Sequence, residues 1–104
     1  MQSIDLLYFD GCPSWQIGLE NLRQAIEAEK LSTEIHLIEI KTPEQAQAEK
    51  FLGSPSFRMN GVDLWPEERS RYLLSCRVYH TSDGLRGAPA IEMLREQIHL
   101  ILAK

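Results

Sequence analysis

The chain has 104 residues, of which 43% are hydrophobic, and its formal net charge at pH 7 is −4. This length and apolar content suit one domain, residues 1–104, whose core can form without a disulfide. Basic residues do not cluster, which argues against nucleic acid or a membrane surface as a partner. The N-terminus lacks a signal-peptide pattern and no apolar run reaches the ~20 residues of a membrane span, so we expect a cytoplasmic protein.

The first predicted element is an apolar stretch over residues 4–9. A nearly unbroken apolar run is typical of a central strand that is covered on both faces. Asp10 and Gly11 end this strand, and apolar residues at helical spacing follow: Trp15, Leu19, Leu22 and Ile26. We therefore expect an amphipathic helix that has Pro13 in its first turn and extends to about residue 30.

Residues 33–40 are rich in β-branched side chains and predict a second strand, whose charged positions indicate the edge of a sheet. The intervening helix makes the unit a right-handed crossover between parallel strands. Thr42, Pro43 and Gln45 then have the pattern of a capped helix start. This second helix is predicted to end at Gly53 in a left-handed cap.

Asn60 and Gly61 separate two short alternating runs, which is a strong hairpin signal and places strands at residues 56–59 and 62–65. A last helix is expected over residues 89–103. The segment 66–88 between them is interpreted as an insertion, in which residues 67–74 could make a helical turn or two and residues 76–79 could extend the sheet by a short strand. The predicted fold is therefore an α/β domain with a mixed four-stranded sheet flanked by about three helices.

Cys12 lies where the first strand gives way to the first helix. Unpaired N–H groups and the positive end of the helix dipole favour an anion there, so a thiolate would be stabilised. The functional interpretation is a nucleophilic cysteine. The alternative is an inert, buried, small apolar residue at a helix start.

This order of elements, together with Cys12-Pro13-Ser14-Trp15 and Ser54-Pro55, resembles the thioredoxin-like superfamily, and its glutaredoxin-sized members most nearly. The resemblance covers residues 3–64 and 87–103. It implies that the Ser54-Pro55 peptide bond is cis and that the backbone of Ser54 is exposed for strand-like pairing with a thiol peptide or glutathione. Pro13, Trp15, Ser54 and Pro55 would then line the substrate groove.

Trp15 stands where that superfamily has the second cysteine of its Cys-x-x-Cys motif, so no disulfide can close within residues 12–15. Three alternatives remain: a monothiol mechanism with an external thiol, a distal resolving cysteine, or a site that has lost its chemistry. Cys76 is the one distal candidate, although a lone cysteine beside apolar residues is more often a packed side chain.

The predicted function is a thiol-disulfide oxidoreductase in which Cys12 attacks and either Cys76 or an external thiol resolves the intermediate. Its partner would be a disulfide-containing protein or a small thiol, with glutathione as co-substrate and no resident cofactor. The alternative is a non-catalytic module that binds a peptide, or a soft metal ion through both thiolates. No histidine lies at metal-ligand spacing from either cysteine, which disfavours the metal. The sequence does not indicate an oligomeric state.

Overall fold

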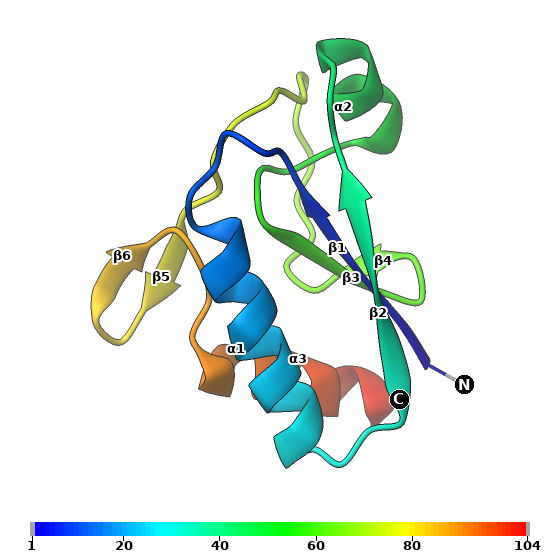
Figure 1. Cartoon of the computed structure of the whole chain (residues 1–104), viewed down its shortest axis with the longest axis vertical. Coiled ribbons are helices and arrows are strands. Elements are labelled where there is room, and N and C mark those ends of the chain that lie inside the picture. Colours follow the sequence, from blue (N-terminus) through cyan, green and yellow to red (C-terminus); the bar gives the residue numbers. More distant parts are fainter. Residues whose placement is uncertain (1, 104) are drawn as a thin grey trace.

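The computed structural model describes residues 2–103 and contains three helices and six strands within them (Figure 1). In chain order the elements are β1 (Gln2–Tyr8), α1 (Trp15–Ala28), β2 (Thr33–Glu39), α2 (Pro43–Glu49), β3 (Ser56–Met59), β4 (Val62–Asp63), β5 (Tyr79–Thr81), β6 (Gly84–Arg86) and α3 (Ile91–Leu102). None of the helices in this part of the chain is long and apolar enough to cross a membrane.

Four strands form a mixed sheet in the order β2-β1-β3-β4. β1 pairs with β2 in parallel, with Ile4 opposite Ile35, and with β3 in antiparallel, with Leu6 opposite Phe57. β1 is thus an interior strand and β2 an edge strand, as predicted. The sheet places the end of β1, which leads to Cys12, next to the start of β3, which follows Pro55.

Helices cover both faces of this sheet. α1 and α3 lie against each other on one face (Figure 1), where they pack on the same core as alternate residues of β1. That core includes Ile4, Leu6, Leu19, Leu22, Phe57, Met59, Leu94 and Ile98. The other face carries a smaller cluster below α2, made of Leu7, Ile40, Ala46 and Phe51. The unbroken apolar run in β1 is explained because successive side chains point to opposite, covered faces.

The first helix begins later than the sequence predicts. α1 starts at Trp15 with Ser14 as its N-cap, so Pro13 precedes the helix instead of occupying its first turn. Proline and serine are both common where helices begin. Here a turn comes before the first helical hydrogen bond, and a hydrogen bond of 3.1 Å from Cys12 N–H to Phe9 O closes that turn. Cys12 therefore lies two residues before the N-cap.

The second helix starts as expected and ends early. The Thr42 side chain accepts a hydrogen bond of 3.0 Å from Gln45 N–H, and Pro43 is the first helical residue. The left-handed cap is Lys50, with φ of 53°, and the predicted cap at Gly53 is wrong. The helix can end there because Lys50 N–H bonds back to carbonyls of the last turn, and Phe51 is then free to enter the core.

The hairpin predicted from Asn60-Gly61 is confirmed. Both residues have positive φ, 54° and 86°, as the tight turn between two antiparallel strands requires. β4 has only two residues, Val62 and Asp63, and so is shorter than predicted.

The segment 66–88 does not add a strand to the main sheet. β5 and β6 form a separate two-stranded sheet, and residues 66–78 contain neither a helix nor a named strand. Cys76 contributes a single parallel bridge to Ser54. The extra strand considered for residues 76–79 does not form, because Cys76 makes a single bridge and Tyr79 belongs to the separate sheet. Side-chain bonds from Arg77 and Tyr79, described below, also hold this segment.

Candidate functional site

Ser54 lies at the centre of the site and is fully buried. Its peptide bond to Pro55 is cis, as the resemblance implies. The Ser54 carbonyl oxygen accepts a hydrogen bond from the Cys12 thiol with an Sγ to O distance of 3.3 Å. The Ser54 hydroxyl oxygen accepts another, of 3.2 Å, from the N–H of Phe9 at the end of β1. Ser54 therefore ties the turn that carries Cys12 to the cis-proline.

The backbone of Ser54 is not open to an external ligand, contrary to expectation. Its N–H donates to Ser75 O at 2.8 Å, and its carbonyl accepts from Arg77 N–H at 3.0 Å. The protein's own segment 75–77 thus fills the position that the resemblance assigns to a bound thiol peptide. Cys76 is the central residue of that segment and the partner of Ser54 across the bridge.

The structure brings the two cysteines together. Both are free thiols and both lie against Ser54, because the Cys12 thiol donates to its carbonyl oxygen and Cys76 pairs with it across the bridge. Interaction with the Cys12 side chain, followed by partial burial, raises the pKa of the Cys76 thiol above its ordinary value. Cys12 is only 1% exposed, whereas Cys76 is exposed and not a packed core residue. One sulfur of the pair is therefore open to solvent and the other is shielded.

Replacement of Cys12 by alanine should make Cys76 react faster with an alkylating reagent. The substitution removes the interaction with the Cys12 side chain that raises the pKa of Cys76, so more thiolate forms at a pH near 8. Rates measured against pH should show a lower midpoint in Cys12→Ala and should converge with the wild type at high pH. Cys12→Ser, which keeps a hydroxyl, is the matched control, and identical midpoints in all three proteins would contradict the contact.

Arg77 anchors the segment that carries Cys76. Its side chain is 7% exposed and donates to both carboxylate oxygens of Asp63, at 3.0 and 3.2 Å, and to Trp65 O at 2.6 Å. The guanidinium also lies 5.2 Å from the centre of the Tyr79 ring. A buried ion pair with all its hydrogen bonds made is costly to break, so these contacts hold the segment firmly against β4.

Tyr79 forms the second anchor. Its side chain is buried against the main core, and its hydroxyl donates to the carbonyl oxygen of Pro55. Burial raises the pKa of Tyr79 above its ordinary value of about 10. The cis-proline is thus bonded through its own carbonyl to the same segment that binds Ser54.

Tyr79→Phe should lower the free energy of unfolding by about 1–3 kcal/mol, because the Pro55 carbonyl loses its donor inside the protein. The pKa of Tyr79 is higher in the folded than in the unfolded state, so its stabilisation is complete below about pH 10 and is lost as the pH rises further. Urea unfolding below and above that pH should show that the free energy of unfolding falls less at high pH in the variant than in the wild type. An equal fall in both proteins would contradict this role of Tyr79.

Two glycines allow close approaches around the cis-proline. A Cβ at Gly18 of α1 would lie 2.9 Å from Pro55 Cγ, so this glycine lets the helix pack directly on the proline. A Cβ at Gly53, whose φ is +114°, would lie 2.9 Å from the Cβ and 3.1 Å from the Cα of Arg77. The segment 75–77 can approach Ser54 because Gly53 has no side chain.

Two further residues predicted for the groove line none of the cavities described below. Pro13 is exposed, and Trp15 is half-buried and stacks on Tyr8 with ring centroids 4.0 Å apart. Sequence reasoning missed the contributions of Gly53, Arg77 and Tyr79. The glycine directly before Ser54-Pro55 was the one local signal that another segment could approach this backbone closely. The partners of Arg77 and Tyr79 are distant in the sequence, so no local pattern indicates them.

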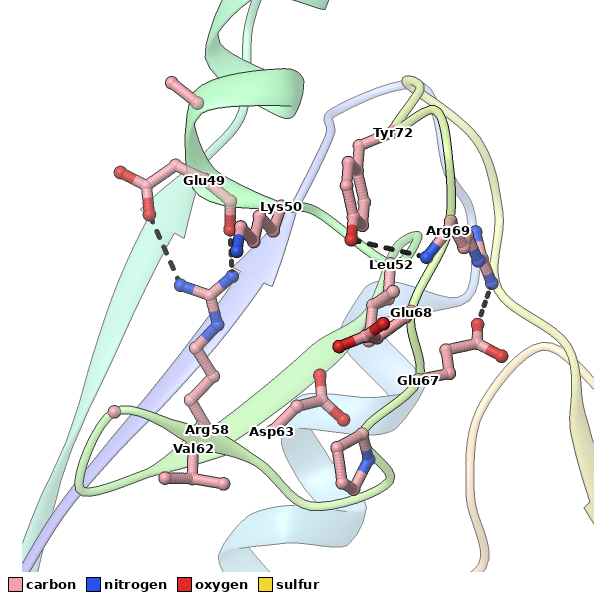
Figure 2. Close-up of a pocket in the computed structure, with 13 residues that line it drawn as sticks. Glu49, Lys50, Leu52, Arg58, Val62, Asp63, Glu67, Glu68, Arg69 and Tyr72 are labelled. Carbon is pink, nitrogen blue, oxygen red and sulfur yellow. Dashed lines mark hydrogen bonds and ion pairs between the residues drawn. The ribbon is translucent and has the colours of Figure 1, made fainter.

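Two cavities flank the segment that follows β4. One, of about 750 Å³, is lined by Cys76 and by largely apolar neighbours that include Trp65, Val78 and Met93. The other, of about 770 Å³, lies between α2, the β3-β4 hairpin and residues 66–72, and neither cysteine lines it. Figure 2 shows two ion pairs within this cavity, Arg58 with Glu49 and Arg69 with Glu67. Of these two cavities, only the first is therefore lined by a thiol.

Among residues 2–103 no group of three or more histidine, cysteine or acidic side chains could hold a metal ion. Comparison of the chain with family models, curated proteins and solved structures found no match. The fold and site define a mixed α/β protein with a four-stranded sheet and three helices, in which two cysteines lie against the serine that precedes a cis-proline.

Proposed function

We propose that this protein is a thioredoxin-like domain that exchanges thiols and disulfides through the Cys12–Cys76 pair. The observation that carries this proposal is that Ser54 holds both cysteines. The Cys12 thiol donates to the Ser54 carbonyl oxygen. The residues on either side of Cys76 form hydrogen bonds with the N–H and the carbonyl group of Ser54. The second thiol that residues 12–15 lack is thereby supplied from the insertion. The cis Ser54-Pro55 bond supports the same assignment.

Exposure favours Cys76 as the first attacking group, the reverse of the order predicted from the sequence. Its thiolate attacks one sulfur of a substrate disulfide, a mixed disulfide forms, and the other substrate sulfur leaves as a thiolate that takes up a proton. The Cys12 thiolate then attacks the Cys76 sulfur, so the Cys12–Cys76 disulfide forms and the second substrate thiol is released. The substrate gains two electrons, and the pair loses them.

An external thiol such as glutathione would return the pair to its dithiol form through the reverse steps, with formation of the oxidised external disulfide. No resident cofactor takes part in these steps. The partner is then a disulfide-containing protein or a small disulfide. A reducing, cytoplasmic setting, which we also propose, would keep the two thiols reduced at rest, as they are in the structure.

Single cysteine variants test the proposal and the order of attack. With a small disulfide as substrate, Cys12→Ser should accumulate a mixed disulfide on Cys76, detectable by intact-protein mass spectrometry, and Cys76→Ser should react slowly because Cys12 is buried. Trapping on Cys12 instead would restore the order predicted from the sequence. If wild type and both variants fail to react, or if disulfide turnover persists in the double variant, the proposal is wrong.

The placement of both cysteines against Ser54 also favours a second candidate, a two-thiolate site for a soft ion such as Cu(I). Native mass spectrometry of the reduced protein with Cu(I) should then show one ion per chain, retained in the wild type and lost in both Cys12→Ser and Cys76→Ser. Retention in either single variant would exclude this candidate.

A further inference from the structure

The segment 75–77 has two backbone edges, and only one is occupied within the protein. The edge that faces Ser54 uses Ser75 O and Arg77 N–H. In a parallel bridge the residue between those two groups points its own N–H and carbonyl to the opposite side. Among the described residues neither backbone group of Cys76 has a hydrogen-bond partner within the protein, and Cys76 is exposed. An outer edge with one free donor and one free acceptor results.

This outer edge borders the cavity of about 750 Å³. Cys76 and Val78 lie in its wall, and Val78 is 57% exposed although it is apolar. Trp65, Pro66 and Met93 supply further apolar surface. The charged residues of the lining are paired, Glu67 with Arg69 and Arg77 with Asp63. The volume lies within the range of about 300–1,000 Å³ typical of ligand sites. An apolar side chain fits this lining better than a charged one.

We propose that an extended peptide that carries the substrate disulfide adds to the outer edge of residues 75–77, with its cysteine opposite Cys76 and a neighbouring apolar side chain in this cavity. The inference rests on the thiol-disulfide exchange proposed above and names its substrate class, a disulfide within an extended protein segment. In an antiparallel pair of strands, directly opposite residues that exchange both backbone hydrogen bonds have Cα atoms about 5.5 Å apart. This spacing suits a disulfide between the two residues. Strand addition of this kind supplies affinity through the main chain and specificity through alternate side chains.

A set of cysteine peptides tests the backbone pairing. Each carries its cysteine as a mixed disulfide with thionitrobenzoate, so attack by Cys76 on the peptide sulfur releases a coloured thiolate. The protein is Cys12→Ser, in which Cys76 is the remaining thiol. N-methylation of the cysteine's own amide removes the donor to Cys76 O. Methylation of the next amide, which points away from the edge, is the matched control.

We expect the cysteine-methylated peptide to react at least about fivefold more slowly than the unmodified and control peptides, the scale of one backbone hydrogen bond. Equal rates for all three peptides, with normal reaction toward a small aryl disulfide, would overturn the docking proposal and leave the exchange chemistry standing. A Cys76 that reacts with neither peptides nor the small disulfide would overturn both.

The cavity is tested with peptides that carry leucine or aspartate two positions from the cysteine, on the same face as its sulfur. The leucine peptide should react about tenfold faster, as expected for one apolar side chain removed from water. Val78→Asp should abolish this preference. Leu85→Asp is the matched control because Leu85 is 58% exposed and lies outside the cavity. No preference in the unsubstituted cavity, or an equal loss in both variants, would contradict its role.

Discussion

Oxidation of Cys12 and Cys76 to a disulfide should raise the free energy of unfolding by about 4 kcal/mol, the chain-entropy value for a closed loop of about 65 residues. Both cysteines already lie against Ser54 in the reduced protein, so we expect little of this gain to be lost to distortion. Urea unfolding of the oxidised and reduced protein measures the difference. Cys12→Ser and Cys76→Ser should show no such dependence on oxidant.

A stability that is unchanged or lowered by oxidation would mean that the two sulfurs cannot bridge without moving the backbone around Ser54. Loss of stabilisation in only one single variant would point instead to an intermolecular disulfide, which non-reducing electrophoresis would reveal. Either result would contradict an intramolecular pair.

Gly53→Ala should separate the two cysteines. The new Cβ would meet the backbone of Arg77, which cannot rotate away as a long side chain could, and φ of +114° is itself unfavourable for alanine. We expect a loss of about 3 kcal/mol in unfolding free energy. Formation of the Cys12–Cys76 disulfide by a small oxidant should slow by about tenfold or more, the effect of ~1.4 kcal/mol on that step.

Gly61→Ala is the matched control for this substitution. Gly61 also has a positive φ, of +86°, but nothing lies within 4 Å of its added Cβ. The variant should lose stability through the backbone alone and form the disulfide at the wild-type rate. Equal disulfide rates in the two alanine variants would show that Gly53 does not position the segment 75–77.

The parts of the fold with local causes could be predicted from the sequence. Asn60 and Gly61 specify their own turn through positive φ, and the Thr42 side chain caps the helix three residues ahead of its partner. The buried character of β1 follows from its apolar run because both faces of an interior strand are covered. The crossover places β2 beside β1 and the hairpin places β4 beside β3, whereas the pairing of β1 with β3 has no local cause.

The location of Cys76 could not be predicted in this way. It depends on Arg77 reaching Asp63 and Trp65, on Tyr79 reaching Pro55, and on Gly53 leaving space for the segment. Each is a tertiary contact between residues at unrelated spacings. The position of Cys12 between a strand and a helix marks it in the sequence as a candidate site residue. The pairing of Cys76 with Ser54 is visible only in the three-dimensional structure.

Titration of the reduced protein with mixtures of reduced and oxidised glutathione would test the pairing most directly, with the state of each cysteine read by alkylation and peptide mass spectrometry. The Cys12–Cys76 pair predicts one two-electron transition in which both cysteines become protected together, with a midpoint less negative than about −300 mV, as for exchange-active disulfides. Glutathione bound to Cys76 while Cys12 stays a free thiol at every ratio would contradict it.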